Sequence, residues 1–226
     1  QGHAVSNSVV IVNVDTHVTH ADIVRAAAAL QRQVLEHFYP VWGVDATVRA
    51  ATPQDPARDD EWRLELRKVP TIEGALGFHD TTDAGLPCLF TFPELDAQDG
   101  VAWTVTASHE ILEALADPWL RRGAQDDQGT WWATEVCDPV EQDTYTIDDV
   151  LVSNFQYPAW QEPPPKPDAH TRYDHLGLCK GPWEVRAGGY AQKYDPAKGW
   201  VQVGMMRAGR AKLGVMGLSR GHRRTT

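Results

Sequence analysis

The chain has 226 residues, of which 42% are hydrophobic and 23% are charged, and its formal net charge is −10. These values are typical of a soluble globular protein with one large domain or two small ones. The acidic balance argues against nucleic acid as a partner, because nucleic-acid binding needs a basic surface. No run of about 18 apolar residues occurs, so the sequence predicts no transmembrane helix and no membrane partner. The three cysteines form no Cys-x-x-Cys pair, which favours a reducing, cytoplasmic compartment over a disulfide framework.

The two ends of the chain differ in character from the rest. Residues 1–3, Gln-Gly-His, are typical of the remnant of a cleaved expression tag. From residue 204 onward, six basic residues occur and no acidic residue. The sequence therefore predicts one domain over residues 4–203 and a basic, disordered tail over 204–226. Contact of this tail with an acidic partner or nucleic acid is the alternative.

The N-terminal half predicts a strand, a helix, several further strands and a second helix. Residues 9–14 form a short β-branched run, which is typical of a buried strand. Residues 20–38 carry apolar side chains at helical spacing, which predicts an amphipathic helix that ends near Pro40. Alternating or apolar runs predict further strands over residues 44–50, 62–69, 75–79 and 86–92.

The C-terminal half is predicted to consist mostly of loops. Short strands are expected over residues 130–136 and 145–152, and a proline-rich loop over 161–167. Gly188-Gly189 predicts a turn. These patterns together predict a single α/β (α+β) domain, with a mixed sheet, a backing helix, a second helix that carries the site, and a loop-rich C-terminal half.

The segment Ser108–Pro118, with the sequence SHEILEALADP, holds the strongest candidate for a functional site. On a helical wheel of about 100° per residue, Glu110 lies about 100° from His109, Glu113 about 40° and Asp117 about 80°. The apolar side chains occupy the opposite side: Ile111, Leu112, Leu115 and Ala116. Like charges crowded on one face cost stability unless a cation offsets them, and His109 and Glu113 can reach one metal ion. A solvated helix face is the alternative.

The pattern His109-Glu110-x-x-Glu113 resembles the His-Glu-x-x-His motif of the zincin metallopeptidases, with glutamate in place of the second histidine. The order of the predicted elements also resembles the N-terminal part of the zincin fold. The resemblance implies a divalent metal, zinc, held by His109 and Glu113, with Glu110 activating a metal-bound water. A carboxylate at position 113 makes the site more anionic and admits other divalent ions. A non-catalytic relative of the zincins is therefore an alternative.

The site needs a third ligand beyond His109 and Glu113. Asp117 lies about 12 Å along the helix axis from His109, so a capping role fits it better. By resemblance to the gluzincins, Glu135 is predicted as the third ligand and Asp138 as the partner of the far ring nitrogen of His109. If this segment is a strand, Cys137 points the other way and is not a ligand. A surface turn is the alternative reading of the segment.

A second resemblance covers most of the chain, from about Gly77 to Tyr190. Here the chain is similar to uncharacterised bacterial proteins with a comparable Ser-His-Glu-x-Leu-Glu-x-Leu-x-Asp-Pro segment and a later Glu-Val-Cys-Asp-Pro-Val-Glu, which stands here at residues 135–141. Two further side chains, Tyr173 and His175, can polarise a carbonyl group or stabilise an oxyanion and are predicted as catalytic. Ordinary packing roles are the alternative for both.

The sequence therefore predicts a metal-dependent hydrolase that acts on a peptide or small-molecule substrate, with peptide bonds preferred. The edge strand near residues 77–92 is expected to align an extended substrate by strand addition. Two alternatives stay open: a non-catalytic binding or structural module, and a tailoring enzyme that uses the same metal for other chemistry. The sequence does not predict the oligomeric state.

Overall fold

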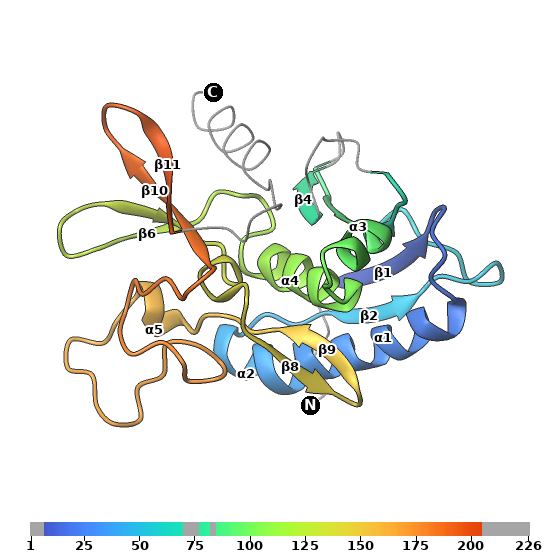
Figure 1. Ribbon diagram of the computed structural model, residues 1–226, viewed down its shortest axis with the longest axis horizontal. Coiled ribbons are helices and arrows are strands. Elements are labelled where there is room, and N and C mark those ends of the chain that lie inside the picture. The colour runs from blue at the N-terminus through green and yellow to red at the C-terminus, as the bar shows by residue number, and fades with distance from the viewer. Residues whose placement is uncertain (1–6, 70–76, 82–84, 205–226) are drawn as a thin grey trace.

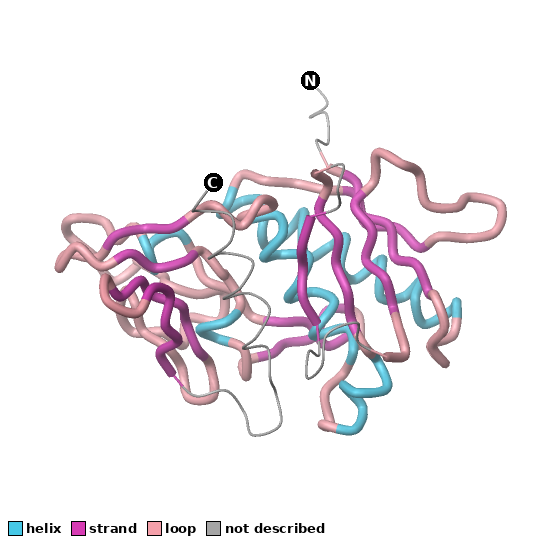
Figure 2. Tube along the Cα trace, turned by 90° about the horizontal axis from the view of Figure 1, so that it is seen from above, coloured by secondary structure: helices cyan, strands magenta, loops and turns pink. Residues whose placement is uncertain are grey.

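The computed structural model describes residues 7–69, 77–81 and 85–204. The predicted basic tail, apart from Gly204, lies outside the described residues. Three sheets occur in the described part: a five-stranded mixed sheet, a four-stranded antiparallel sheet and a two-stranded hairpin (Figure 1). Both views of the molecule place the two larger sheets at opposite ends (Figure 2). Within this part of the chain, no helix is long and apolar enough to cross a lipid bilayer.

The five-stranded sheet has the strand order β2-β1-β3-β5-β4. The first three pairings in this order are parallel, and β4 pairs with β5 in the antiparallel direction at the edge. Its mixture of strand directions, together with the helices, confirms the predicted α/β fold class. The strands, in chain order, are β1 (Ser8–Asn13), β2 (Thr47–Ala50), β3 (Trp62–Leu66), β4 (Gly77–Thr81) and β5 (Pro87–Thr91).

One face of this sheet packs against both long helices, α1 (His20–Arg32) and α4 (Trp103–Ala116). Ile11 lies opposite Leu64, and Leu64 lies opposite Leu89, so these three side chains share a face. All three are buried in one core cluster with apolar residues of both helices. The helix α4 therefore lies between the sheet and the rest of the molecule, near the centre of Figure 1.

The first helix continues beyond its predicted end. After α1 the chain forms a π-helical segment, η1 (Gln33–Phe38), and then the short helix α2 (Tyr39–Trp42). Pro40 falls in the first turn of α2, directly after the π-helical segment. The helical run ends at Trp42, close to the predicted end near Pro40, and Gly43, whose φ is 69°, terminates it.

A hairpin replaces the single strand that was predicted over residues 145–152. Its strands are β8 (Thr144–Ile147) and β9 (Val150–Ser153). The two residues between them, Asp148 and Asp149, have φ values of 47° and 64°. Two consecutive left-handed residues form the tight turn that matches the twist of a two-stranded ribbon. The continuous strand was a wrong prediction because neither aspartate is the glycine that usually marks such a turn.

The four-stranded sheet has the order β11-β10-β7-β6. Its strands are β6 (Gly123–Gln125), β7 (Trp131–Ala133), β10 (Tyr190–Asp195) and β11 (Gly199–Gly204). The strand predicted over 130–136 is confined to β7. Residues 134–137 belong to no strand, and the 3₁₀ turn η2 (Asp138–Val140) comes directly after them. Two short helices, α3 (Pro93–Gln98) and α5 (Pro158–Gln161), were not predicted.

Candidate metal centre

The helix α4 is buried on every side, and each residue from 105 to 116 is buried. Glu110 and Glu113 are both 0% exposed. The alternative of a solvated helix face is therefore wrong, because a solvated carboxylate would be open to water. Thr106, one turn before Glu110, donates a hydrogen bond of 2.8 Å from Oγ1 to Oδ1 of Asp96 in α3 and so helps to fix the helix. Ionised carboxylates in such an interior need a cation or several donors to offset the loss of water.

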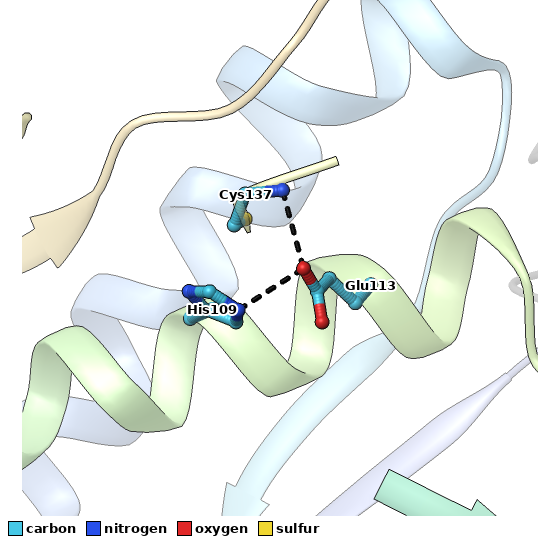
Figure 3. A group of neighbouring side chains, drawn as sticks. All are labelled: His109, Glu113 and Cys137. Carbon is cyan, nitrogen blue, oxygen red and sulfur yellow. Dashed lines mark hydrogen bonds and ion pairs between the residues drawn. The ribbon is translucent and has the colours of Figure 1, made fainter. Parts of the chain in front are cut away.

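Two carboxylates lie close to the same ring nitrogen of His109. Nε2 of His109 lies 3.0 Å from Oε1 of Glu113, one turn further along α4 (Figure 3). The same Nε2 lies 3.0 Å from Oδ1 of Asp138. In a tetrahedral zinc site with metal–ligand bonds of about 2.0–2.1 Å, neighbouring nitrogen and oxygen donors lie roughly 3.3 Å apart. The two separations of 3.0 Å are therefore close to those of donors that share one ion.

Cys137 brings a sulfur atom to the same place. A ligand atom each from His109, Glu113 and Cys137 lie within 4.8 Å of one another, and all three residues are buried. The backbone N–H of Cys137 also donates a hydrogen bond of 3.3 Å to Oε1 of Glu113 (Figure 3). The expectation that Cys137 points away depended on a strand, and residues 134–137 form none. Pro139 could have indicated that no strand continues through this segment, because proline cannot donate a hydrogen bond within a central strand.

The position of Asp138 also differs from the prediction. The sequence placed its carboxylate on the far ring nitrogen of His109, as an orienting partner. In the structure, Asp138 faces Nε2, the nitrogen that also faces Glu113. Asp138 is fully buried and opens the turn η2. Its carboxylate therefore belongs to the immediate surroundings of the candidate ion.

The other acidic residues singled out from the sequence have different positions. Glu135, the predicted third ligand, is 2% exposed and precedes Cys137 by two residues. Glu135 stays a predicted ligand. The side chains that lie against Glu113 and His109 belong instead to Cys137 and Asp138. Asp117 accepts hydrogen bonds of 2.8 Å from the backbone N–H groups of the two arginines that follow the helix, Arg121 and Arg122. This contact is the capping role preferred for Asp117 over direct metal binding.

Tyr173 and His175 lie in two separate surroundings. Tyr173 is buried in a second core cluster with Trp160 and Cys179. The His175 ring stacks on His37 of η1, with ring centroids 4.7 Å apart and an interplanar angle of 22°. Burial lowers the pKa of His175 to about 4. The catalytic role of Tyr173 and His175 stays a prediction.

A tyrosine connects the stacked histidines with the neighbourhood of the metal centre. The hydroxyl of Tyr145 lies 2.9 Å from Nδ1 of His37 and accepts a hydrogen bond of 3.1 Å from Nε2 of Gln33. Burial raises the pKa of Tyr145, and the charge on nearby Cys137 raises it further. The hydroxyl is therefore protonated at neutral pH and is able to donate to His37. Sequence patterns gave no sign of this contact, because it joins η1 to β8, two segments that lie far apart in the sequence.

The donor set defines what the centre can hold. An imidazole nitrogen, carboxylate oxygens and a thiol together suit a divalent ion of intermediate softness. The buried group of His109, Glu113 and Cys137 could therefore hold a metal ion. Comparison of the chain with protein families, with curated proteins and with solved structures gave no match in any of the three. The function must accordingly be inferred from the side chains of this centre.

Proposed function

We propose that the protein is a metal-dependent hydrolase whose ion is held by His109, Glu113 and Cys137. The observation that supports this proposal is the buried convergence of a nitrogen, an oxygen and a sulfur donor within 4.8 Å. Zinc fits such a mixed donor set, because it accepts imidazole, carboxylate and thiolate ligands in tetrahedral sites. Three protein ligands would leave the fourth position open, as in catalytic zinc sites. Asp138, whose Oδ1 lies 3.0 Å from Nε2 of His109, would lie close to the ion.

Glu110 supplies the acid–base chemistry in this proposal. It directly follows His109 in α4, and it shares the helix face of Glu113 at a spacing of three residues. A bound zinc ion would supply Lewis acidity and lower the pKa of a coordinated water. Glu110 would take the proton of the attacking water as the oxygen–carbon bond forms, and would return it to the leaving amine as the carbon–nitrogen bond breaks.

A peptide is the preferred substrate class because of the neighbouring sheet edge. Among the described strands, β4 lies at the edge of the five-stranded sheet, next to β5. An edge strand offers backbone donors and acceptors that an extended peptide can pair with. The helix α4 packs against both β4 and β5. A peptide added to this edge would therefore pair with a strand that contacts the helix that carries Glu110.

A structural cation site is the second candidate function, and the depth of the centre favours it. Glu110, Glu113, Cys137 and Asp138 are each 0% exposed. If Asp138 joined the three other donors, four protein ligands would close the coordination sphere, as in structural zinc sites. Such an ion would contribute folding energy and leave no position for water. The number of protein ligands therefore separates the two candidate functions.

The first test is metal analysis of the protein after exposure to zinc or manganese and removal of the excess. We expect one ion per chain in the wild type and in His170→Ala, which changes an exposed histidine, and none in His109→Ala. Absence of metal from the wild type would overturn the metal centre itself.

The second test is a peptide-library digest by metal-loaded protein, with Glu110→Gln as the matched variant. The amide cannot accept the proton of water but keeps the size of the side chain. We expect cleavage by the wild type and loss of cleavage by a factor of about 100 or more in Glu110→Gln. Metal binding without cleavage in either protein would favour the structural site.

A further inference from the structure

Tyr190 begins β10, which packs against the turn η2 of the metal centre, although no sequence pattern pointed to this residue. The residue is only 1% exposed. Burial raises the pKa of Tyr190 well above its ordinary value, and three nearby carboxylates raise it further, namely Asp138, Glu141 and Glu113. The hydroxyl is therefore protonated, and it lies among acceptors. Ionised carboxylates only accept hydrogen bonds, so toward them a protonated phenol acts as the donor.

The turn before Tyr190 is built to bring β10 against the turn η2. The N–H of Arg186 donates a hydrogen bond of 2.8 Å to the carbonyl oxygen of Pro139. A Cβ atom on Gly189 would lie 2.4 Å from that same carbonyl oxygen and 2.9 Å from the carbonyl oxygen of Asp138. Only glycine permits this approach of the two backbones. The close contact fixes Tyr190 relative to Asp138.

The hydroxyl of Tyr190 lacks a completed hydrogen bond within the described residues. Buried hydroxyl groups in proteins normally have a partner, so an exception calls for a physical explanation. Of the three carboxylates, Asp138 has the largest influence on the Tyr190 pKa, and its backbone lies against Gly189, the residue directly before Tyr190. Asp138 in turn faces Nε2 of His109.

We propose that Tyr190 is a positioning residue of the metal centre, which donates its hydroxyl proton in a hydrogen bond to Asp138 when the ion is bound. The hydrogen bond holds the carboxylate of Asp138 beside the ligand His109. This inference rests on the metal centre proposed above. Partners of this kind, one shell outside the ligands, typically change metal affinity by roughly 10-fold to 100-fold when they are removed.

The test compares Tyr190→Phe with Tyr194→Phe. Both variants remove one hydroxyl from β10, and Tyr194 is exposed on the same strand. Zinc and cobalt(II) affinities are measured by competition with a chromophoric chelator, and the visible spectrum of the cobalt form is recorded. We expect Tyr190→Phe to bind either ion roughly 10-fold to 100-fold more weakly, with a changed cobalt spectrum. Tyr194→Phe should match the wild type.

A purely structural role for Tyr190 predicts a different pattern. Removal of a buried hydroxyl without a completed hydrogen bond does not cost the metal-free protein a partner. We therefore expect the metal-free Tyr190→Phe protein to melt at the wild-type temperature or above it. A lowered melting temperature with unchanged metal affinity and an unchanged cobalt spectrum would overturn the proposal.

A double-mutant cycle tests whether Tyr190 acts through Asp138. In an Asp138→Asn background, Tyr190→Phe should cause less than a 3-fold further loss of cobalt affinity, because the carboxylate is already gone. A full additional loss in that background would also overturn the proposal. If the wild type binds no metal, the proposed centre fails first, so the two failures are distinguishable.

Discussion

The backbone N–H of Ser153 in β9 donates a hydrogen bond of 2.7 Å to Oγ of Ser108, the residue directly before His109. The Ser108 hydroxyl in turn donates to the carbonyl oxygen of Val105 at 2.9 Å. Both serines are fully buried. This chain of bonds fixes α4 against the hairpin at the point where the first candidate ligand leaves the helix.

Replacement of Ser108 by alanine should therefore destabilise the protein. The N–H of Ser153 would stay buried without its acceptor, which costs about 1–3 kcal/mol. Thr104→Ala is the matched control, because the Thr104 hydroxyl joins the same helix to the same strand through the carbonyl oxygen of Leu151, at an exposed position. The free energy of unfolding in urea checks both variants. Equal losses of unfolding free energy in Ser108→Ala and Thr104→Ala would contradict a special role for the buried hydrogen bond to Ser108.

The identity of the third ligand can be decided between Cys137 and Glu135. We expect cobalt-loaded wild type to show thiolate-to-cobalt absorption in the near ultraviolet, and Cys137→Ser to lose it. Glu135→Gln should keep this band, because the proposed ligands are unchanged. Cys179→Ser is the control: burial raises the pKa of that thiol to about 12, so it stays protonated. Absence of the thiolate band from the cobalt-loaded wild type, with normal binding in Cys137→Ser and weak binding in Glu135→Gln, would restore the ligand set expected from the sequence.

The sequence predicted the helix of the site well because its evidence is local. His109, Glu110 and Glu113 share a face at any position where the segment is helical. The same pattern could not show that the face is buried, since burial comes from β9 and the segment around Cys137, which are distant in sequence. The side chains of Cys137 and Asp138 were placed wrongly for a related reason. Their directions depend on where β7 ends, and strand ends are set by tertiary packing rather than by alternation.

Acid should destabilise the protein through the stacked histidines. Burial lowers the pKa of His175 to about 4 and also lowers the pKa of His37. The unfolded chain takes up protons near pH 6.5, whereas folded His175 stays neutral down to about pH 4. Stability is therefore complete above pH 6.5 and falls as the pH decreases toward 4.

The groups around this pair set the size of the acid effect. Arg172 opposes protonation of His175, Asp174 favours it, and Glu36 favours protonation of His37. We expect a loss of about 1–2 kcal/mol between pH 6.5 and 4, less than the full shift implies because the rings are partly exposed. Melting temperatures measured between pH 6.5 and 4 test this expected loss of stability. His175→Phe keeps an aromatic ring and cannot titrate, so its acid slope should be shallower; an unchanged slope would assign the effect elsewhere.

The turn of the β8–β9 hairpin offers a stabilising substitution. Asp149 has a φ of 64°, which costs an ordinary residue conformational energy that glycine avoids. Asp148, in contrast, forms an ion pair of 2.7 Å with Arg32 and is kept. Asp149→Gly should therefore raise the free energy of unfolding by about 0.5–1 kcal/mol, because the second position of this turn strongly prefers glycine. Gly43→Ala, which adds a side chain at a φ of 69°, should lower it by about 1 kcal/mol. Urea denaturation of the two variants beside the wild type measures both changes, and opposite signs are the required result.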